Sequence, residues 1–200
     1  DHRDLHSFPT RRSSDLNARV YLQVGTVLEG GNFIINSGTV IFDVPVAITI
    51  EPLFKSFTMS GNSTLTTSYH TSVHNFSVII NVAQEGGTGD VSIAAGSSIN
   101  VNSKGFSGGY GTGVGTIAGD YQGGGGGAYG GNGGLGQGSR AGGTAYGSIL
   151  APVNIGSGGG NATGGASGGS GGGAVKITCS GDFSLEGTIN ANGEIGRAHV

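Results

Sequence analysis

The sequence predicts an all-β fold: a right-handed parallel β-helix (β-solenoid) fragment that carries a glycine-rich, polyglycine II-like insertion. Residues 17–104 are dense in Val, Ile, Thr, Phe, Ser and Asn, which is the composition of β-strands. No window repeats apolar residues at helical spacing for more than a turn. Short strand phrases recur between glycine and polar turns, which is typical of stacked repeats. A β-sandwich remains the alternative, because strand composition does not fix topology.

The two ends of the chain do not belong to the predicted fold. Residues 1–16, DHRDLHSFPTRRSSDL, are similar to the translation of a sequencing adapter, and residues 194–200, EIGRAHV, are similar to the opposite adapter. Segments of that origin are set aside before fold reasoning. We therefore expect the natural protein to continue in at least one direction.

Between these ends, two copies of one strand phrase predict stacked rungs. In residues 17–104, VSI at 91–93 leads to SINVN at 98–102, and in residues 174–193, VKI at 175–177 leads to TINAN at 188–192. Stacked rungs align like residues, so the phrases predict Ile99 against Ile189 and Asn100 against Asn190. We assign residues 17–104 to β-solenoid rungs and residues 174–193 to a further rung.

Residues 105–173 form the glycine-rich insertion, with 32 of the 45 glycines of the chain. Every third residue from Gly124 to Ala151 is Gly, Ser or Ala, whereas the intervening positions admit Tyr, Leu, Gln and Arg. Three residues per turn is the repeat of the polyproline II helix, and an edge without side chains lets such helices pack closely. The spacing favours an ordered bundle, and the alternative is a flexible linker.

Composition excludes several classes of protein. The net charge is -3 and only 10% of residues are charged, so the chain lacks the Lys and Arg surplus of a nucleic-acid binder. A single cysteine makes no internal disulfide and no multi-thiolate metal site. No run of eighteen apolar residues occurs, so we expect no membrane-spanning helix in this fragment.

Nucleotide, hydrolase and metal motifs occur without their structural context. G-x-G-x-x-G appears at 125–130 and 131–136, but neither copy follows a strand and opens a helix. G-x-S-x-G appears at 165–169 and 168–172, and the histidines outside the adapter-like ends, His70 and His74, both lie upstream of it. His70 and His74 lie in a stretch rich in β-branched and polar residues, where we expect a strand or loop and not a metal-binding helix. A single carboxylate, Asp90 or Asp120, does not predict a calcium site. We predict no catalytic, cofactor-binding or metal-binding residue and no cofactor.

Two alternative functions depend on particular side chains. A polysaccharide-degrading β-helix enzyme, a lyase or glycoside hydrolase, would need carboxylates that converge, and Asp182 and Glu186 are the pair able to meet across a turn. An ice-binding surface would need a flat threonine array, whereas Thr64, Thr66 and Thr67 form only a cluster. Cys179 alternates with Ile177 and is expected to face inward as a small hydrophobe.

The phrases GSGGG at 156–160 and GTINANG at 187–193 carry a family resemblance that extends over residues 91–193. They are similar to a module of large glycine-rich β-helix proteins, most of which are secreted or surface-exposed. The resemblance implies extracellular structural or adhesive work without catalytic residues. We therefore predict a non-catalytic extracellular module of a larger surface or secreted protein, and we favour this reading over an enzyme. Its expected partners are carbohydrates or other surface proteins and not nucleic acid, and we expect no membrane span in this fragment.

Overall fold

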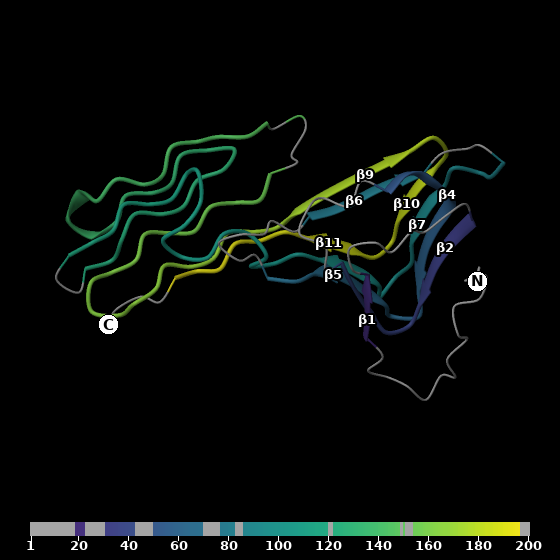
Figure 1. The fold of residues 1–200 in the computed structure, drawn as a ribbon, viewed down its shortest axis with the longest axis horizontal. Coiled ribbons are helices and arrows are strands. Elements are labelled where there is room, and N and C mark those ends of the chain that lie inside the picture. Colours follow the sequence, from purple (N-terminus) through teal and green to yellow (C-terminus); the bar gives the residue numbers. More distant parts are fainter. Residues whose placement is uncertain are drawn as a thin grey trace, which may run out of the picture.

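The computed structural model describes residues 19–22, 31–42, 50–69, 77–82, 86–119, 122–148, 150 and 154–196. These residues form a body of β-strands beside a bundle of extended glycine-rich segments (Figure 1). The described part of the chain contains one short 3-10 turn, Gln137–Ser139, and no α-helix. None of its helices is therefore long and apolar enough to cross a membrane. The adapter-like residues 1–16 and 197–200 lie outside the described residues.

The first sheet consists of five strands that all run parallel. Its strands alternate buried apolar residues with half-exposed polar ones, because successive side chains of a strand point to opposite faces. The inward residues Val40, Leu65 and Ile99 are buried. In spatial order the strands are β1 (Arg19–Leu22), β3 (Thr39–Phe42), β5 (Thr64–Thr67), β8 (Ser98–Asn100) and β11 (Thr188–Asn190).

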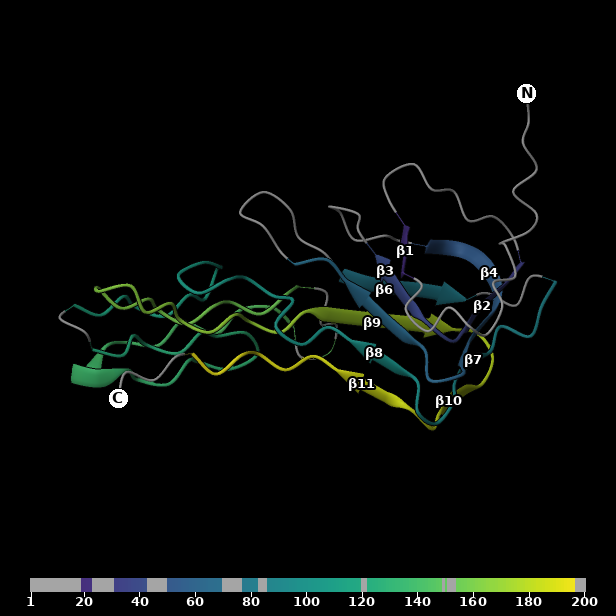
Figure 2. The ribbon, with the colours of Figure 1, turned by 90° about the horizontal axis from the view of Figure 1, so that it is seen from below.

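The second sheet is also parallel and curls around the core (Figure 2). The long strand β4 (Ile50–Ser60) is its branch point, because β4 pairs with three other strands. These are β2 (Gly31–Asn36), β6 (Ser77–Val82) and β7 (Val91–Ile93). The outer strands are β9 (Ala174–Cys179), which pairs with β6, and β10 (Phe183–Leu185), which pairs with β7.

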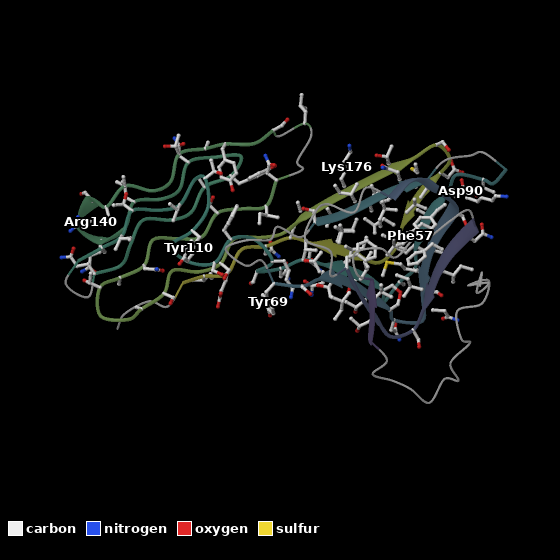
Figure 3. The ribbon with its side chains drawn as sticks, in the orientation of Figure 1. Phe57, Tyr69, Asp90, Tyr110, Arg140 and Lys176 are labelled. Carbon is white, nitrogen blue, oxygen red and sulfur yellow. The ribbon has the colours of Figure 1, made fainter. Side chains whose placement is uncertain are left out.

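The core lies between the two sheets and consists of columns of apolar side chains, one from each paired strand. Phe57 stands in register with Val91, and Met59 stands in register with Ile93; all four side chains are buried. Near the start of the stack, the ring of Phe33 packs on Phe54 and Phe57, with centroid distances of 4.8 and 5.6 Å. Figure 3 shows Phe57 pointing into this core. Stacked burial of this kind is the main favourable contribution to folding.

The predicted β-helix is wrong, although the all-β class is consistent with the structure. Strands β6 and β9 are hydrogen-bonded into the same sheet as β4, β7 and β10, so this sheet curls as a half-barrel where a β-helix would turn through separate faces. The β-sandwich alternative is wrong as well, because every described strand pair is parallel. The predicted pairings of Ile99 with Ile189 and of Asn100 with Asn190 are confirmed. Short repeated stretches of sequence predict which strands pair and in what register, but they do not predict how the sheet curves.

The glycine bundle, which we define as the described residues between 105 and 173, is extended and ordered. Backbone hydrogen bonds join its segments: Gly143 N donates to Gly126 O, Gly126 N to Gly134 O and Gly133 N to Gly143 O, at 2.8 to 2.9 Å. The segments approach so closely that a Cβ on Gly143 would overlap the carbonyl oxygen of Gly113. Glycine is the one residue that fits such a contact. The described residues of the glycine bundle therefore pack backbone against backbone instead of forming a flexible linker.

Glycines of the three-residue series make close contacts of this kind, and so do glycines outside the series, such as Gly125 and Gly143. At five positions of the series, an added Cβ would overlap backbone atoms of a neighbouring segment: Gly124, Gly127, Gly133, Gly136 and Gly142. The following residues 191–196 run beside the bundle, where Glu194 N donates to Ser170 O at 2.7 Å. The bundle thus includes a chain segment that lies after the last strand.

Candidate functional site

The outward side of the first sheet carries a row of hydroxyl groups. Thr39 is in register with Thr64, Thr64 with Ser98, and Ser98 with Thr188. Their neighbours Val40, Leu65 and Ile99 are buried, so alternation turns the hydroxyl-bearing side chains away from the core. Neighbouring strands of a sheet lie about 4.8 Å apart, which sets the spacing of the row. Four hydroxyl side chains from four distant stretches of sequence thereby form one line.

A second line runs beside the first, two residues further along each strand. Ile41 is in register with Thr66, and Asn100 with Asn190. Thr66 connects the two pairs, because its Oγ1 donates to the backbone oxygen of Asn100 at 2.5 Å. We call these two lines the hydroxyl-amide face. Its members are Thr39, Thr64, Ser98, Thr188, Ile41, Thr66, Asn100 and Asn190.

Hydrogen bonds hold the asparagines of this face and of the turns that follow it. Asn102 N donates to Asn100 Oδ1 at 3.1 Å, and Asn192 N donates to Asn102 Oδ1 at 2.8 Å. Asn190 Nδ2 donates to Thr188 Oγ1 at 3.2 Å. Side chains fixed by such bonds lose little further conformational entropy when they bind a ligand.

An aromatic ring and a cation lie where the strands of this face end. Tyr69 follows β5, Lys104 follows β8, and the ammonium of Lys104 lies 3.4 Å from the centroid of the Tyr69 ring. This distance is that of a cation-π contact. The Tyr69 side chain is 69% exposed, while partial burial lowers the pKa of Lys104 from its usual value. Figure 3 shows Tyr69 on the lower surface of the strand body.

The chemistry of the face is that of neutral polar recognition. Hydroxyl and amide groups both donate and accept hydrogen bonds. An exposed tyrosine ring adds an apolar surface with a polar tip. None of the eight side chains of the face titrates in the physiological range. The face can therefore bind a neutral polar surface, and it offers no group for acid-base catalysis.

The two carboxylates considered for an enzyme lie at opposite ends of a strand. Asp182 precedes β10 and Glu186 follows it, and both are exposed. At about 3.3 Å per residue, the four steps from Asp182 to Glu186 place their Cα atoms about 13 Å apart. Asp182 is held through its backbone N, which donates to Asp90 Oδ1 at 2.8 Å. The carboxylate of Asp90 thus holds the backbone just before β10. The extended strand keeps the carboxylates of Asp182 and Glu186 apart.

Some of the remaining motif residues lie outside the part of the chain that the structure describes. His70, His74 and Asp120 lie outside the described residues. In the described ranges, no group of three His, Cys, Asp or Glu side chains could hold a metal ion. The G-x-G-x-x-G stretches at 125–130 and 131–136 lie in the glycine bundle, and a 3-10 turn follows the second one. Cys179 packs partly buried against the core, as its alternation with Ile177 predicts.

The hydroxyl row was missed by the sequence analysis, which recognised only the cluster at Thr64, Thr66 and Thr67. Neighbouring members of the row lie 25 to 90 residues apart in the sequence, and only strand pairing aligns them. A signal was present: each strand of the row opens with a Thr or Ser directly before an apolar residue, which is buried at Val40, Leu65 and Ile99 and half-buried at Ile189. The phrases are TV at 39–40, TL at 64–65, SI at 98–99 and TI at 188–189.

Neither a family model, nor a curated protein, nor a solved structure matches this chain. The resemblance to glycine-rich surface proteins stays a prediction from the quoted phrases.

Proposed function

We propose that the chain is a non-catalytic structural and adhesive module of a larger surface or secreted protein, and that it binds neutral carbohydrate through the hydroxyl-amide face. One observation carries this proposal: Thr39, Thr64, Ser98 and Thr188 form a single row on one sheet. A line of evenly spaced hydroxyl groups matches a ligand that repeats its own hydroxyl groups along a chain. Polysaccharides are ligands of this kind.

Two further features support carbohydrate as the ligand class. The face is uncharged, which favours a neutral ligand over a polyanion. The exposed ring of Tyr69 beside it offers a surface on which an apolar sugar face can pack. The extracellular location is supported by the resemblance of the glycine-rich phrases.

A binding assay on insoluble and soluble polysaccharides tests the proposal. We expect retention by a neutral polysaccharide such as cellulose, chitin or mannan, and not by polygalacturonate. The double variant Thr64→Val and Thr188→Val removes two hydroxyl groups of the row. At about 0.7 kcal/mol for each lost hydrogen bond, affinity falls roughly tenfold.

The matched control is Thr178→Val, which removes an exposed hydroxyl of β9 on the second sheet. We expect this variant to bind as the unchanged chain does. Absence of binding to every neutral polysaccharide, or equal losses in the double variant and in Thr178→Val, contradicts the proposal. Release of unsaturated sugars from a polyuronide, abolished by Asp182→Ala or Glu186→Ala, would establish a lyase instead.

Ice binding is a second candidate, and the same row favours it. The threonine cluster is part of a longer line, because pairing adds Thr39, Ser98 and Thr188 to Thr64. Inhibition of ice recrystallisation by the intact chain, lost in the Thr64→Val and Thr188→Val variant and kept in Thr178→Val, would support this function. Unchanged crystal growth at every protein concentration would remove it.

A further inference from the structure

The outward side of the second sheet carries a row of polar side chains of its own. Thr58 of β4 is in register with Ser92 of β7, and Ser92 is in register with Ser184 of β10. Their strand neighbours Phe57 and Val91 are buried, so alternation turns the hydroxyl groups away from the core. This row is separate from the hydroxyl-amide face, which belongs to the first sheet.

Strand β2 extends the row with two exposed asparagines whose side chains are held in place. Ser56 Oγ donates to Asn32 Oδ1 at 2.9 Å, and Ser60 Oγ donates to Asn36 Oδ1 at 3.2 Å. An amide has two N–H donors in addition to its oxygen. In the described part of the chain, no protein acceptor takes a hydrogen bond from the Nδ2 group of Asn32 or Asn36. Both amides are thus oriented and keep their donors for a ligand.

An exposed apolar side chain stands between the two amides. Ile34 is in register with Thr58, and its side chain is 62% exposed. Each asparagine is two residues away from Ile34 on the same side of β2, which is about 7 Å along a strand. A sugar ring complements this arrangement, because its C–H groups form an apolar patch that hydroxyl groups surround. We call Asn32, Ile34, Asn36, Thr58 and Ser92 the second-sheet face.

The charges around the second-sheet face favour a neutral ligand over a polyanion. None of its five side chains is charged. At its border, Lys55 precedes Ser56 in β4, Asp90 precedes β7, and Asp182 and Glu186 flank β10. The border therefore carries more negative than positive charge, which opposes binding of an acidic polysaccharide.

The second-sheet face is open whatever lies at the edges of its sheet. Strands are added to a sheet in its plane, whereas side chains project to either side of that plane. A further strand beside β2 or β10 would lengthen this face and leave it uncovered. The second-sheet face and the hydroxyl-amide face lie on different sides of the strand body, because the core lies between the two sheets.

We propose that the second-sheet face is a second carbohydrate site, so that one copy of the chain bridges two neutral polysaccharide chains. This inference rests on the proposed function, because it assigns the same class of ligand to both faces. The amides of Asn32 and Asn36 donate to sugar hydroxyl groups, and the apolar side of a sugar ring packs on Ile34. Isoleucine offers less apolar surface than the ring of Tyr69, so the second site is the weaker one.

Agglutination of beads coated with mannan, cellulose or chitin tests the bridge. We expect the unchanged chain to agglutinate the beads that retain it, because one copy holds polysaccharide chains of two beads. Asn32→Ala combined with Asn36→Ala removes both amides, and the affinity of the second-sheet face should fall roughly tenfold. This double variant should lose agglutination. Its retention by the beads should stay close to that of the unchanged chain, since the stronger hydroxyl-amide face is intact.

The matched control is Asn81→Ala. Asn81 lies in β6 of the same sheet, and its partner in register is Thr178 of β9, so it is not part of the second-sheet face. We expect this variant to be retained and to agglutinate beads as the unchanged chain does. Copies that associate with one another could bridge beads through the hydroxyl-amide face alone, and the asparagine double variant would then still agglutinate them.

Three results overturn the bridge and leave the proposed function standing. They are retention of the unchanged chain without agglutination, equal agglutination by the unchanged chain and the asparagine double variant, and an equal loss of agglutination in the double variant and in Asn81→Ala. Absence of retention by every coating removes the proposed function, and the bridge with it.

Discussion

Tyr129 and Tyr146 of the glycine bundle differ in the hydrogen bonding of their hydroxyl groups. Their rings pack edge to face with centroids 5.3 Å apart. The hydroxyl of Tyr146 donates to Ile155 O at 2.6 Å and accepts from Ser157 Oγ at 2.8 Å. The hydroxyl of Tyr129 is buried, and the described residues give it no hydrogen-bond partner. The ring pair joins segments of the bundle, while only Tyr146 adds polar contacts.

Replacing each tyrosine by phenylalanine should therefore give different results. Tyr146→Phe removes two hydrogen bonds, and we expect the free energy of unfolding to fall by about 1 to 2 kcal/mol. Tyr129→Phe removes a buried hydroxyl without a partner and should leave stability unchanged or slightly higher. Urea denaturation of both variants measures the difference. Equal losses would show that the two hydroxyl groups are equivalent.

Burial of Tyr146 also makes stability depend on alkaline pH. Desolvation raises the pKa of Tyr146, the nearby Tyr129 adds to the rise, and the hydrogen bond with Ser157 opposes it. Because the pKa of Tyr146 is higher in the folded chain, its protonated hydroxyl contributes fully to stability below the unfolded pKa of about 10. This contribution is lost as the pH rises through the pKa of Tyr146 in the folded chain. The urea midpoint should fall above about pH 10, and fall less steeply in Tyr146→Phe. Parallel profiles for the two proteins would contradict this assignment.

At the scale of the element, the glycine bundle separates positions that need glycine from positions that tolerate a side chain. Gly143 is buried, and a Cβ there would overlap Gly113 O. Gly134 has no atom within 4 Å of the place a Cβ would occupy. Both residues stand in the same bundle and in similar sequence, so neighbouring backbone is what distinguishes them.

Alanine substitutions at these two positions test the packing of the bundle. We expect Gly143→Ala to lower the free energy of unfolding by about 1 to 3 kcal/mol, because close-packed backbone must move apart. Gly134→Ala should be neutral or stabilise the chain by up to about 1 kcal/mol, because alanine restricts the unfolded chain. Thermal unfolding followed by circular dichroism compares them. A flexible bundle would tolerate both changes equally.

Sequence reasoning succeeded where the signal is local. The phrases around Ile99 and Ile189 predicted a pairing across 90 residues, because each contains the same turn and strand. It failed where arrangement depends on distant contacts. The curl of the second sheet is set by β4, which has three partners and a register shift between Ile50 and Phe54. The hydroxyl row was not predicted for the same reason, since Thr39 and Thr188 are aligned only through the two strands that lie between them, β5 and β8.

At the scale of the whole molecule, the strand body and the glycine bundle are joined where the chain leaves and returns. The chain enters the bundle after β8 and comes back at β9, and hydrogen bonds connect the two passages. Gly105 N donates to Gly171 O at 2.8 Å, and Gly173 N donates to Val101 O at 2.9 Å. The bundle thus begins as a continuation of paired strands (Figure 1).

Hydrogen exchange measures whether the two parts share their order. We expect slow exchange for bundle amides that donate to backbone oxygens, such as Gly143, Gly126 and Gly133, because exchange requires these bonds to open. Protection in strand β8 should be lost together with protection at Gly105 and Gly173. Bundle amides that exchange at the rate of an unfolded peptide would contradict an ordered bundle.

The scarcity of apolar side chains in the bundle has a thermal consequence. Its fully covered apolar residues are few and mostly small, namely Ala118, Ala128 and Ile155, so its cohesion comes mainly from peptide groups. The heat capacity change on melting grows with the apolar area that becomes hydrated. The bundle therefore melts with a small heat capacity change. We expect cooling, which weakens hydrophobic burial, to leave this part of the molecule intact.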